Sequence, residues 1–179
     1  MTRERGLEFT IPTKVTFGSG SLITLAEEVA RSGFKRVALI TANDLIQLNL
    51  AEKAIKMAEQ GGARTLVYSG VESNPTTQLV AKGVEALEPF VPDCLVGFGG
   101  GSAIDLAKGI GICLGHHTRD IRVFQYKPNI ERRSVPVICI PTTSGTGSEV
   151  NYWAVVSDPR AKERDSPSEI RGWPHIWRS

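Results

Sequence analysis

Short apolar runs alternate along the chain with longer segments in which apolar residues recur every three or four positions. The short runs are rich in Val, Ile and Leu and are bounded by turn-forming residues, which is typical of buried strands. They span residues 35–41, 63–69, 93–98 and 135–140. The longer segments predict helices at residues 21–33, 50–62, 76–88 and 102–115. Strands that alternate with helices and are apolar on both faces predict a parallel sheet with helices on both sides.

The chain has the size of one globular domain. It holds 179 residues, of which 41% are hydrophobic and 22% are charged, and this is enough to bury a core. No internal repeat or low-complexity linker interrupts the pattern. The segment FTIPTKVTFGSG at residues 9–20 predicts a strand pair, or a strand and a turn, ahead of the first helix.

Charge and hydropathy exclude several kinds of partner. The net charge is only +2, and Lys and Arg are spread among acidic residues, so we predict no nucleic-acid partner. The opening residues MTRERGLEFTIP lack the apolar core of a secretion signal, and no later apolar run approaches the length that spans a bilayer. We therefore predict a cytoplasmic protein with no membrane partner.

The cysteines predict a structural role. Cys94, Cys113 and Cys139 lie in apolar stretches and show no C-x-x-C spacing. Buried, reduced thiols are the commonest state of such residues. We expect them to be free and to take no part in redox or metal chemistry.

A glycine-rich loop, GFGGGSAIDLAK, follows the third predicted strand. Gly99, Gly100 and Gly101 allow a tight turn and let a ligand approach the main chain. Ser102 is predicted at the helix N-cap, with Asp105 three positions later as in a capping box. The free amides of the first helical turn and the positive end of the helix dipole favour a phosphate. A simple tight turn before a helix is the alternative.

A hydroxyl-rich loop, VICIPTTSGTGSEV, follows the fourth predicted strand. Its hydroxyls and glycine amides offer a neutral lining for phosphate and ribose oxygens. The donors are Thr142, Thr143, Ser144, Thr146 and Ser148. A helix cap with spare hydroxyls is the alternative. Because ligands bind at the carboxyl ends of parallel strands, two anion sites after successive strands together predict a dinucleotide.

These motifs carry a resemblance to a known family. GGGSAIDLAKGIG followed by IPTTSGTGSEV, with FGSGSL and SNPT upstream, resembles the nucleotide-binding domain of the iron-dependent (group III) alcohol dehydrogenases from about Phe9 to Lys162. Glycerol dehydrogenase and dehydroquinate synthase share the wider layout. The resemblance implies a Rossmann-like α/β fold of the dehydroquinate synthase N-terminal type, and an NAD(P)-dependent interconversion of alcohols and aldehydes.

The resemblance also implies which residues bind the cofactor, NADP or NAD. Gly100, Gly101 and Ser102 match the pyrophosphate-binding turn, and Asp105 matches a residue that supports the helix start and faces the cofactor. The double threonine Thr142 and Thr143, with Thr146 close by, matches residues that reach the phosphate and ribose. Asn74 matches a residue on the adenine side, with a turn before Pro75 as its alternative, and Val155 matches a backbone contact.

Position 42 departs from the pattern of the NAD-using members. Many of these carry Asp there, whose carboxylate accepts from the ribose hydroxyl and repels a 2′-phosphate. This chain has Ala42 in ITANDL. A small neutral residue removes that repulsion, so NADP is predicted to be tolerated or preferred.

The family's metal ligands are not matched. In the family, one Asp and three His in a following all-helical domain hold Fe²⁺ or another divalent ion such as Zn²⁺. This chain has three histidines: His116 and His117 are adjacent in a loop, and His175 lies near the end. None has a partner at ligand spacing, so we predict no metal site and assign no catalytic residue.

The last residues differ in composition from the rest. From Glu163 on, charges, two prolines and two tryptophans replace the strand that the family has there. We expect an NAD(P)-binding domain at residues 1–162 and a divergent, disordered tail at residues 163–179. A disrupted reading frame is one hypothesis. A genuine short protein whose tryptophans cover the domain face is the other.

Three functions therefore remain open. The first is a metal-dependent alcohol dehydrogenase that acts on a small alcohol or aldehyde. The second is a catalytically silent dinucleotide-binding module or remnant, and the third is a glycerol dehydrogenase-like enzyme. The sequence leaves the substrate and a homo-oligomeric state open.

Overall fold

A four-stranded parallel sheet forms the centre of the molecule. The computed structural model describes residues 13–125, 134–151, 153–160 and, for the backbone alone, 169–172. The strands are β1 (Arg36–Thr41), β2 (Arg64–Tyr68), β3 (Cys94–Gly99) and β4 (Val137–Pro141), and their order is β2-β1-β3-β4. All three neighbouring pairs are parallel. The four strands and the parallel sheet predicted from the sequence are confirmed.

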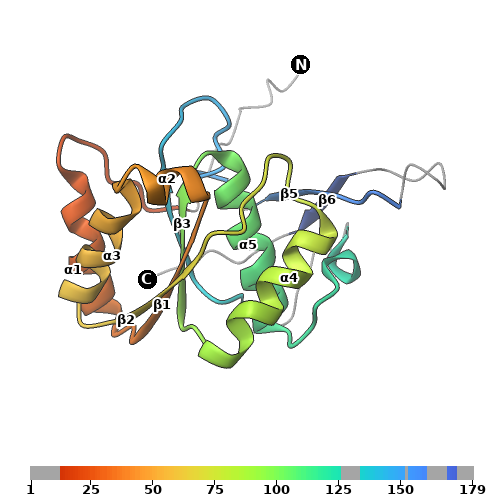
Figure 1. The fold of residues 1–179 in the computed structure, drawn as a ribbon, viewed down its shortest axis with the longest axis horizontal. Helices are drawn as coiled ribbons and strands as arrows, with labels where there is room; N and C mark the ends of the chain where they lie inside the picture. The colour runs from red at the N-terminus through yellow and green to blue at the C-terminus, as the bar shows by residue number, and fades with distance from the viewer. Residues whose placement is uncertain (1–12, 126–133, 152, 161–168, 173–179) are drawn as a thin grey trace, which may run out of the picture.

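Helices cover both faces of this sheet (Figure 1). One face carries α1 (Thr24–Ser32), α2 (Asn43–Gln47) and α3 (Leu50–Gln60). The other face carries α4 (Thr77–Leu87) and α5 (Gly101–Gly115). Short 3₁₀ turns η1 (Ser21–Ile23), η2 (Glu88–Phe90) and η3 (Ile121–Phe124) complete the described helical structure. The four predicted helices are confirmed, and α2 was not predicted.

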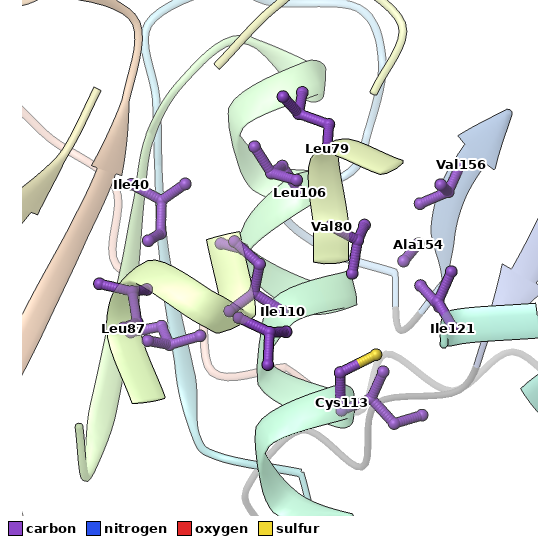
Figure 2. Packing of buried hydrophobic residues seen from close by; sticks show 14 of the residues in the cluster. Ile40, Leu79, Val80, Leu87, Leu106, Ile110, Cys113, Ile121, Ala154 and Val156 are labelled. Atoms are coloured by element: carbon purple, nitrogen blue, oxygen red, sulfur yellow. The ribbon is translucent and has the colours of Figure 1, made fainter. Parts of the chain in front are cut away.

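The two cores follow from the alternation of side chains along the central strands. On β1, Val37 and Leu39 join the cluster under α1 and α3, whereas Ala38 and Ile40 join the cluster under α4 and α5. Successive side chains of a strand point to opposite faces, so a strand that is buried on both faces is apolar at every position. Figure 2 shows the second cluster, which contains Ile40 of β1 together with Leu106 and Ile110 of α5.

Two further strands pack outside α5. β5 (Ala154–Ser157) and β6 (Glu169–Gly172) pair in an antiparallel ladder. Ala154 and Val156 are buried against the α4–α5 core (Figure 2), while Val155 between them is exposed. β6 forms a strand where the sequence analysis expected a disordered tail. The boundary at residue 162 stays a prediction.

The opening segment differs in part from its prediction. Residues 9–12 lie outside the described residues, and residues 13–17 form no strand. The expected turn is present, because Gly20 has a φ of 77° and leads directly into η1. Within the part of the chain that the structure describes, no helix combines the length and apolarity needed to cross a membrane.

The strand order creates a switch point beside β1. The chain leaves β1 through α3 to reach β2 on one side, and then returns through α4 to reach β3 on the other side. The crossing helices therefore lie on opposite faces, and the carboxyl ends of β1 and β3 open between them. Ligands of such sheets bind at this point.

Candidate functional site

The glycine-rich and hydroxyl-rich loops leave the same edge of the sheet side by side. Phe98 of β3 is paired with Ile140 of β4, and Gly99 is paired with Pro141. One residue further, the Thr142 amide donates to the Gly99 carbonyl at 2.9 Å. The adjacency expected from the sequence is confirmed.

The two loops are in direct contact at Gly100 and Gly101. A Cβ on Gly100 would lie 3.1 Å from Oγ1 of Thr143, and a Cβ on Gly101 would lie 2.9 Å from Cγ2 of Thr146. Both distances are too short for a relaxed contact. The glycines therefore allow the two threonines to lie against the backbone at the start of α5.

Helix α5 begins without a side-chain cap. Its N-cap is Gly100, which has an extended backbone, and no side chain of the described residues caps the helix. The Gly100 carbonyl accepts from the amides of Ala103 at 3.0 Å and Ile104 at 3.3 Å. The predicted capping box, with Ser102 as N-cap, is wrong, because Gly100 takes the cap geometry and Ser102 is the second residue of the helix. Uncapped amides and the dipole of a 15-residue helix favour an anion at this end.

The hydroxyl-rich loop presents its threonines outward. Thr142, Thr143 and Thr146 are exposed, whereas Ser148 is buried. The Ser148 amide donates to Oγ1 of Thr146 at 3.3 Å. The three hydroxyls named by the resemblance therefore lie beside the α5 terminus, where a phosphate or ribose oxygen could accept from them.

Asp105 lies one turn along α5 and is only 7% exposed. Burial raises the pKa of its carboxyl to about 6, although the Lys108 ammonium, the Val155 backbone and the Ser148 side chain act in the opposite direction. Its Oδ1 has no hydrogen-bond partner among the described residues. A buried carboxyl oxygen without a partner is costly, so Asp105 is an acceptor that a bound ligand could satisfy.

Lys108 is the residue that the sequence analysis missed. Its side chain is fully buried, and its ammonium donates to oxygens at the end of the hydroxyl-rich loop and directly after it. The acceptors are the main-chain carbonyls of Ser148, Asn151 at 2.7 Å and Trp153 at 2.9 Å, and Oδ1 of Asn151 at 3.2 Å. Burial lowers the pKa of Lys108, and the nearby Cys139, Asp105 and Glu149 act in the opposite direction.

A signal for Lys108 was present in the sequence. The helix that contains it, SAIDLAKGIGICLG, is apolar on every side except for Asp105 and Lys108. A helix that is apolar on all sides is buried, so its lysine has no solvent-exposed face. Asp105 and Lys108 are three positions apart, a spacing at which helical side chains are neighbours.

The other predicted cofactor residues lie around the same edge. Ala42 is the N-cap of α2, directly after β1, and forms an isolated antiparallel bridge with Gly70. Asn74 is exposed and has a φ of 54° in the connection between β2 and α4, which also fits its alternative role in a turn. Val155 lies on β5, where its backbone is close enough to Asp105 to lower the pKa of that carboxyl.

The described residues offer no group of three His, Cys, Asp or Glu side chains that could hold a metal ion. Nδ1 of His116 is 2.8 Å from the Ile112 carbonyl, and its ring packs edge-on against Phe124. His117 is exposed, and His175 lies outside the described residues. A divalent ion therefore does not fit the donors of the described part.

The three cysteines are free. Burial raises the pKa of Cys94, that of Cys113 to about 12 and that of Cys139 to about 11. The prediction of free cysteines in apolar surroundings is confirmed.

Comparison with known proteins adds to this geometry. The family model described as iron-containing alcohol dehydrogenase matches residues 12–174. This match extends past Lys162, where the sequence analysis ended the resemblance. The tail segment thus contributes to the family match.

Individual relatives agree with that match. A choline dehydrogenase of Bacillus subtilis (strain 168) is 36% identical over 152 residues, which are 84% of this chain and 38% of that protein. A lactaldehyde reductase of Escherichia coli (strain K12) is 32% identical over 149 residues, or 83% of this chain and 39% of that protein. A solved 1,3-propanediol oxidoreductase superposes with a TM-score of 0.84 at 25% identity, covering 95% of this chain and 43% of that one. This chain thus spans about two fifths of the length of these relatives.

Proposed function

This chain belongs to the iron-containing alcohol dehydrogenase family, and we propose that its α/β domain binds NAD(P) for the interconversion of a small alcohol and an aldehyde. The observation that carries the proposal is the contact of the two loops at Gly101 and Thr146. This contact leaves the uncapped amides of α5 beside exposed hydroxyls. A phosphate fits such a site, because uncapped main-chain amides and hydroxyl donors meet there.

Each predicted residue then has a role toward the dinucleotide. The amides of Gly100, Gly101 and Ser102 bind the pyrophosphate at the start of α5. The hydroxyls of Thr142, Thr143 and Thr146 donate to phosphate and ribose oxygens. Asn74 lines the adenine side, and Val155 contributes its backbone. Asp105, with its unsatisfied Oδ1, accepts from a donor of the cofactor.

The bound nicotinamide supplies hydride transfer to or from the carbon of the substrate. The residues of this chain bind and orient the cofactor for that step. We assign no catalytic residue to the described part, and no step through a metal ion, because the donors present there do not fit one.

The cofactor of this proposal is NADP or NAD, with NADP tolerated or preferred. Ala42 stands at the carboxyl end of β1, where a carboxylate would repel a 2′-phosphate. An alanine there brings no negative charge. The proposal also includes a cytoplasmic location, as predicted from the sequence, and it is compatible with a homo-oligomer.

A second candidate is a dinucleotide-binding module without catalytic activity. It is favoured by one observation, the lack of three metal-binding side chains in proximity within the described residues. The two candidates share cofactor binding and differ in turnover and in metal content.

Fluorescence titration of the purified chain with NADPH and NADH tests the common part of the proposal. We expect saturable binding of NADPH, with displacement by ADP and little displacement by adenosine, because the pyrophosphate carries most of the contacts. Binding that adenosine displaces as well as ADP does, or no saturation in the millimolar range, would contradict it. Metal analysis and an aldehyde-reduction assay on the same sample then separate the two candidates.

A further inference from the structure

The ammonium of Lys108 is held by the main chain of a distant segment. Most lysines that pack their stem against apolar surface keep the ammonium in water. The ammonium of Lys108 is instead buried, and three of its four acceptors are the main-chain carbonyls of Ser148, Asn151 and Trp153. Bonds to main-chain oxygens fix the path of the backbone, whatever side chains the segment carries. Lys108 therefore acts on the course of the backbone at Ser148, Asn151 and Trp153.

The same segment is tied together internally. Nδ2 of Asn151 donates to the Gly147 carbonyl at 2.8 Å, and the Trp153 amide donates to Oδ1 of Asn151 at 2.8 Å. The Ser148 amide donates to Thr146, so the hydrogen bonds reach back to the threonine that touches Gly101. A displacement of Ser148, Asn151 or Trp153 is thus passed on to Thr146.

Lys108 and Gly101 lie on the same side of α5. They are seven positions apart, which is close to two turns of helix or about 10 Å along its axis. The loop is therefore fastened to α5 at two points, by Thr146 at the start of the helix and by the Lys108 ammonium two turns further. Two fastenings on one rigid helix set the position of the hydroxyls relative to the uncapped amides.

We propose that Lys108 is a positioning residue that holds residues 146–151 and Trp153 against α5 and thereby sets the affinity of the cofactor site. This inference rests on the proposed function for its ligand, and on the hydrogen bonds alone for its structural part. Lys108 does not touch the cofactor in this proposal, since its donors are directed to the loop.

The variant Lys108→Met tests this role, because methionine keeps an unbranched side chain only one atom shorter and removes the charge and the donors. We expect the Kd of NADPH to rise about tenfold or more, since bonds from a charged group are lost. Hydrogen exchange of the amides at 142–153 should become faster, while that of β2 stays unchanged. The control is Ile110→Ala on the same helix, which is buried in the α4–α5 core and should lower the melting temperature without changing the Kd.

The pKa of the Asp105 carboxyl is a second measurement, and a loss of stability alone would not change it. Removal of the Lys108 charge should move the pKa of the Asp105 carboxyl upward, and Ile110→Ala should not move it. Carboxyl NMR of the two variants measures this difference. If Lys108→Met does not fold, Asn151→Ala replaces it, because that change removes two hydrogen bonds within the segment and one from Lys108, and it removes no residue of the two hydrophobic clusters.

The outcomes separate this inference from the proposed function. If the unaltered chain binds NADPH and Lys108→Met or Asn151→Ala binds it equally well, the positioning role is wrong. If the unaltered chain binds no cofactor, the proposed function fails, and exchange at 142–153 alone decides whether Lys108 fastens the loop. Faster exchange in the variant supports the anchor, and unchanged exchange overturns it.

Discussion

Gly101 and Thr146 are in contact at the start of α5, where a Cβ on the glycine would lie 2.9 Å from Cγ2 and 3.0 Å from Oγ1 of the threonine. Gly101 lies within the helix and has no positive φ. Position 101 therefore requires glycine because there is no space for a Cβ, and not because of its backbone conformation. Gly99 is the residue of the triplet that needs glycine for its backbone, with a φ of 147°.

Replacement of Gly101 by alanine should separate the two loops. The new methyl group would force Thr146 away from the helix, so we expect the Kd of NADPH to rise about tenfold, as for the loss of one or two hydrogen bonds. The measurement is a fluorescence titration. The control is Gly83→Ala, whose Cβ would collide with Ile110 in the core. Gly83→Ala should destabilise the protein and leave the Kd of the folded fraction unchanged, and an equal effect of both variants on Kd would contradict the prediction.

The main elements of the fold could be predicted because each is long and strongly patterned. The central strands β1 and β3 are buried on both faces and are continuous apolar runs, as Val37 to Ile40 show. The helix α2 has only five residues, too few for an apolar period to be visible. β5 was missed because a four-residue strand with one buried face shows only Ala154 and Val156 as a pattern.

The candidate site could be predicted in its location but not in its contacts. The loops were found from glycine and hydroxyl composition, and the parallel strands brought them to one edge. The N-cap of α5 was predicted at Ser102 and lies two residues earlier, at Gly100. Both residue types are common at N-caps, so the sequence does not fix the boundary. The partners of Lys108 could not be predicted, because they include the main-chain carbonyls of Ser148 and Trp153, which carry no sequence pattern.

Introduction of a carboxylate at position 42 tests the cofactor preference. We expect the unaltered chain to bind NADPH at least as tightly as NADH. Ala42→Asp should weaken NADPH about tenfold or more and should affect NADH little, because two negative charges near 4–5 Å repel by about 1 kcal/mol in water and more at a protein surface. The control is Ala42→Asn, which has a similar shape and no charge. NADH that binds tenfold more tightly than NADPH to the unaltered chain would contradict the inference from Ala42.

The cysteines should react slowly with thiol reagents while the protein is folded. Burial raises the pKa of each thiol, and thiolate is the reactive form. At pH 8 we expect little reaction of the native protein with an aromatic disulfide, and complete reaction of all three cysteines in denaturant. Cys139 should react first, because it is half-buried while Cys94 and Cys113 are buried. Rapid labelling of Cys94 in the folded protein would contradict the burial that the structure shows.

The ionisation of Asp105 should lower the stability of the free protein. The pKa of its carboxyl is about 6 in the folded protein against an ordinary value of 3.8, so the folded state holds the proton more tightly than the unfolded state. With this sign, the free energy of unfolding falls as the pH rises from about 4 to about 6 and changes no further above that range. A shift of this size corresponds to about 2–3 kcal/mol.

Asp105→Asn should remove this effect, because asparagine resembles the neutral carboxyl. We expect the variant to be more stable than the unaltered chain by about 2–3 kcal/mol at pH 8 and equally stable near pH 4, as measured by urea unfolding at a series of pH values. Its affinity for NADPH should fall, because asparagine replaces one carboxylate oxygen by an NH₂ group, which donates and cannot accept as the unpaired Oδ1 can. Glu59→Gln, a change at an exposed residue with a single hydrogen bond to Thr65, is the control and should show neither effect. A variant that is less stable than the unaltered chain at pH 8 would mean that the attraction between the charges of Asp105 and Lys108 outweighs the cost of burying the Asp105 charge.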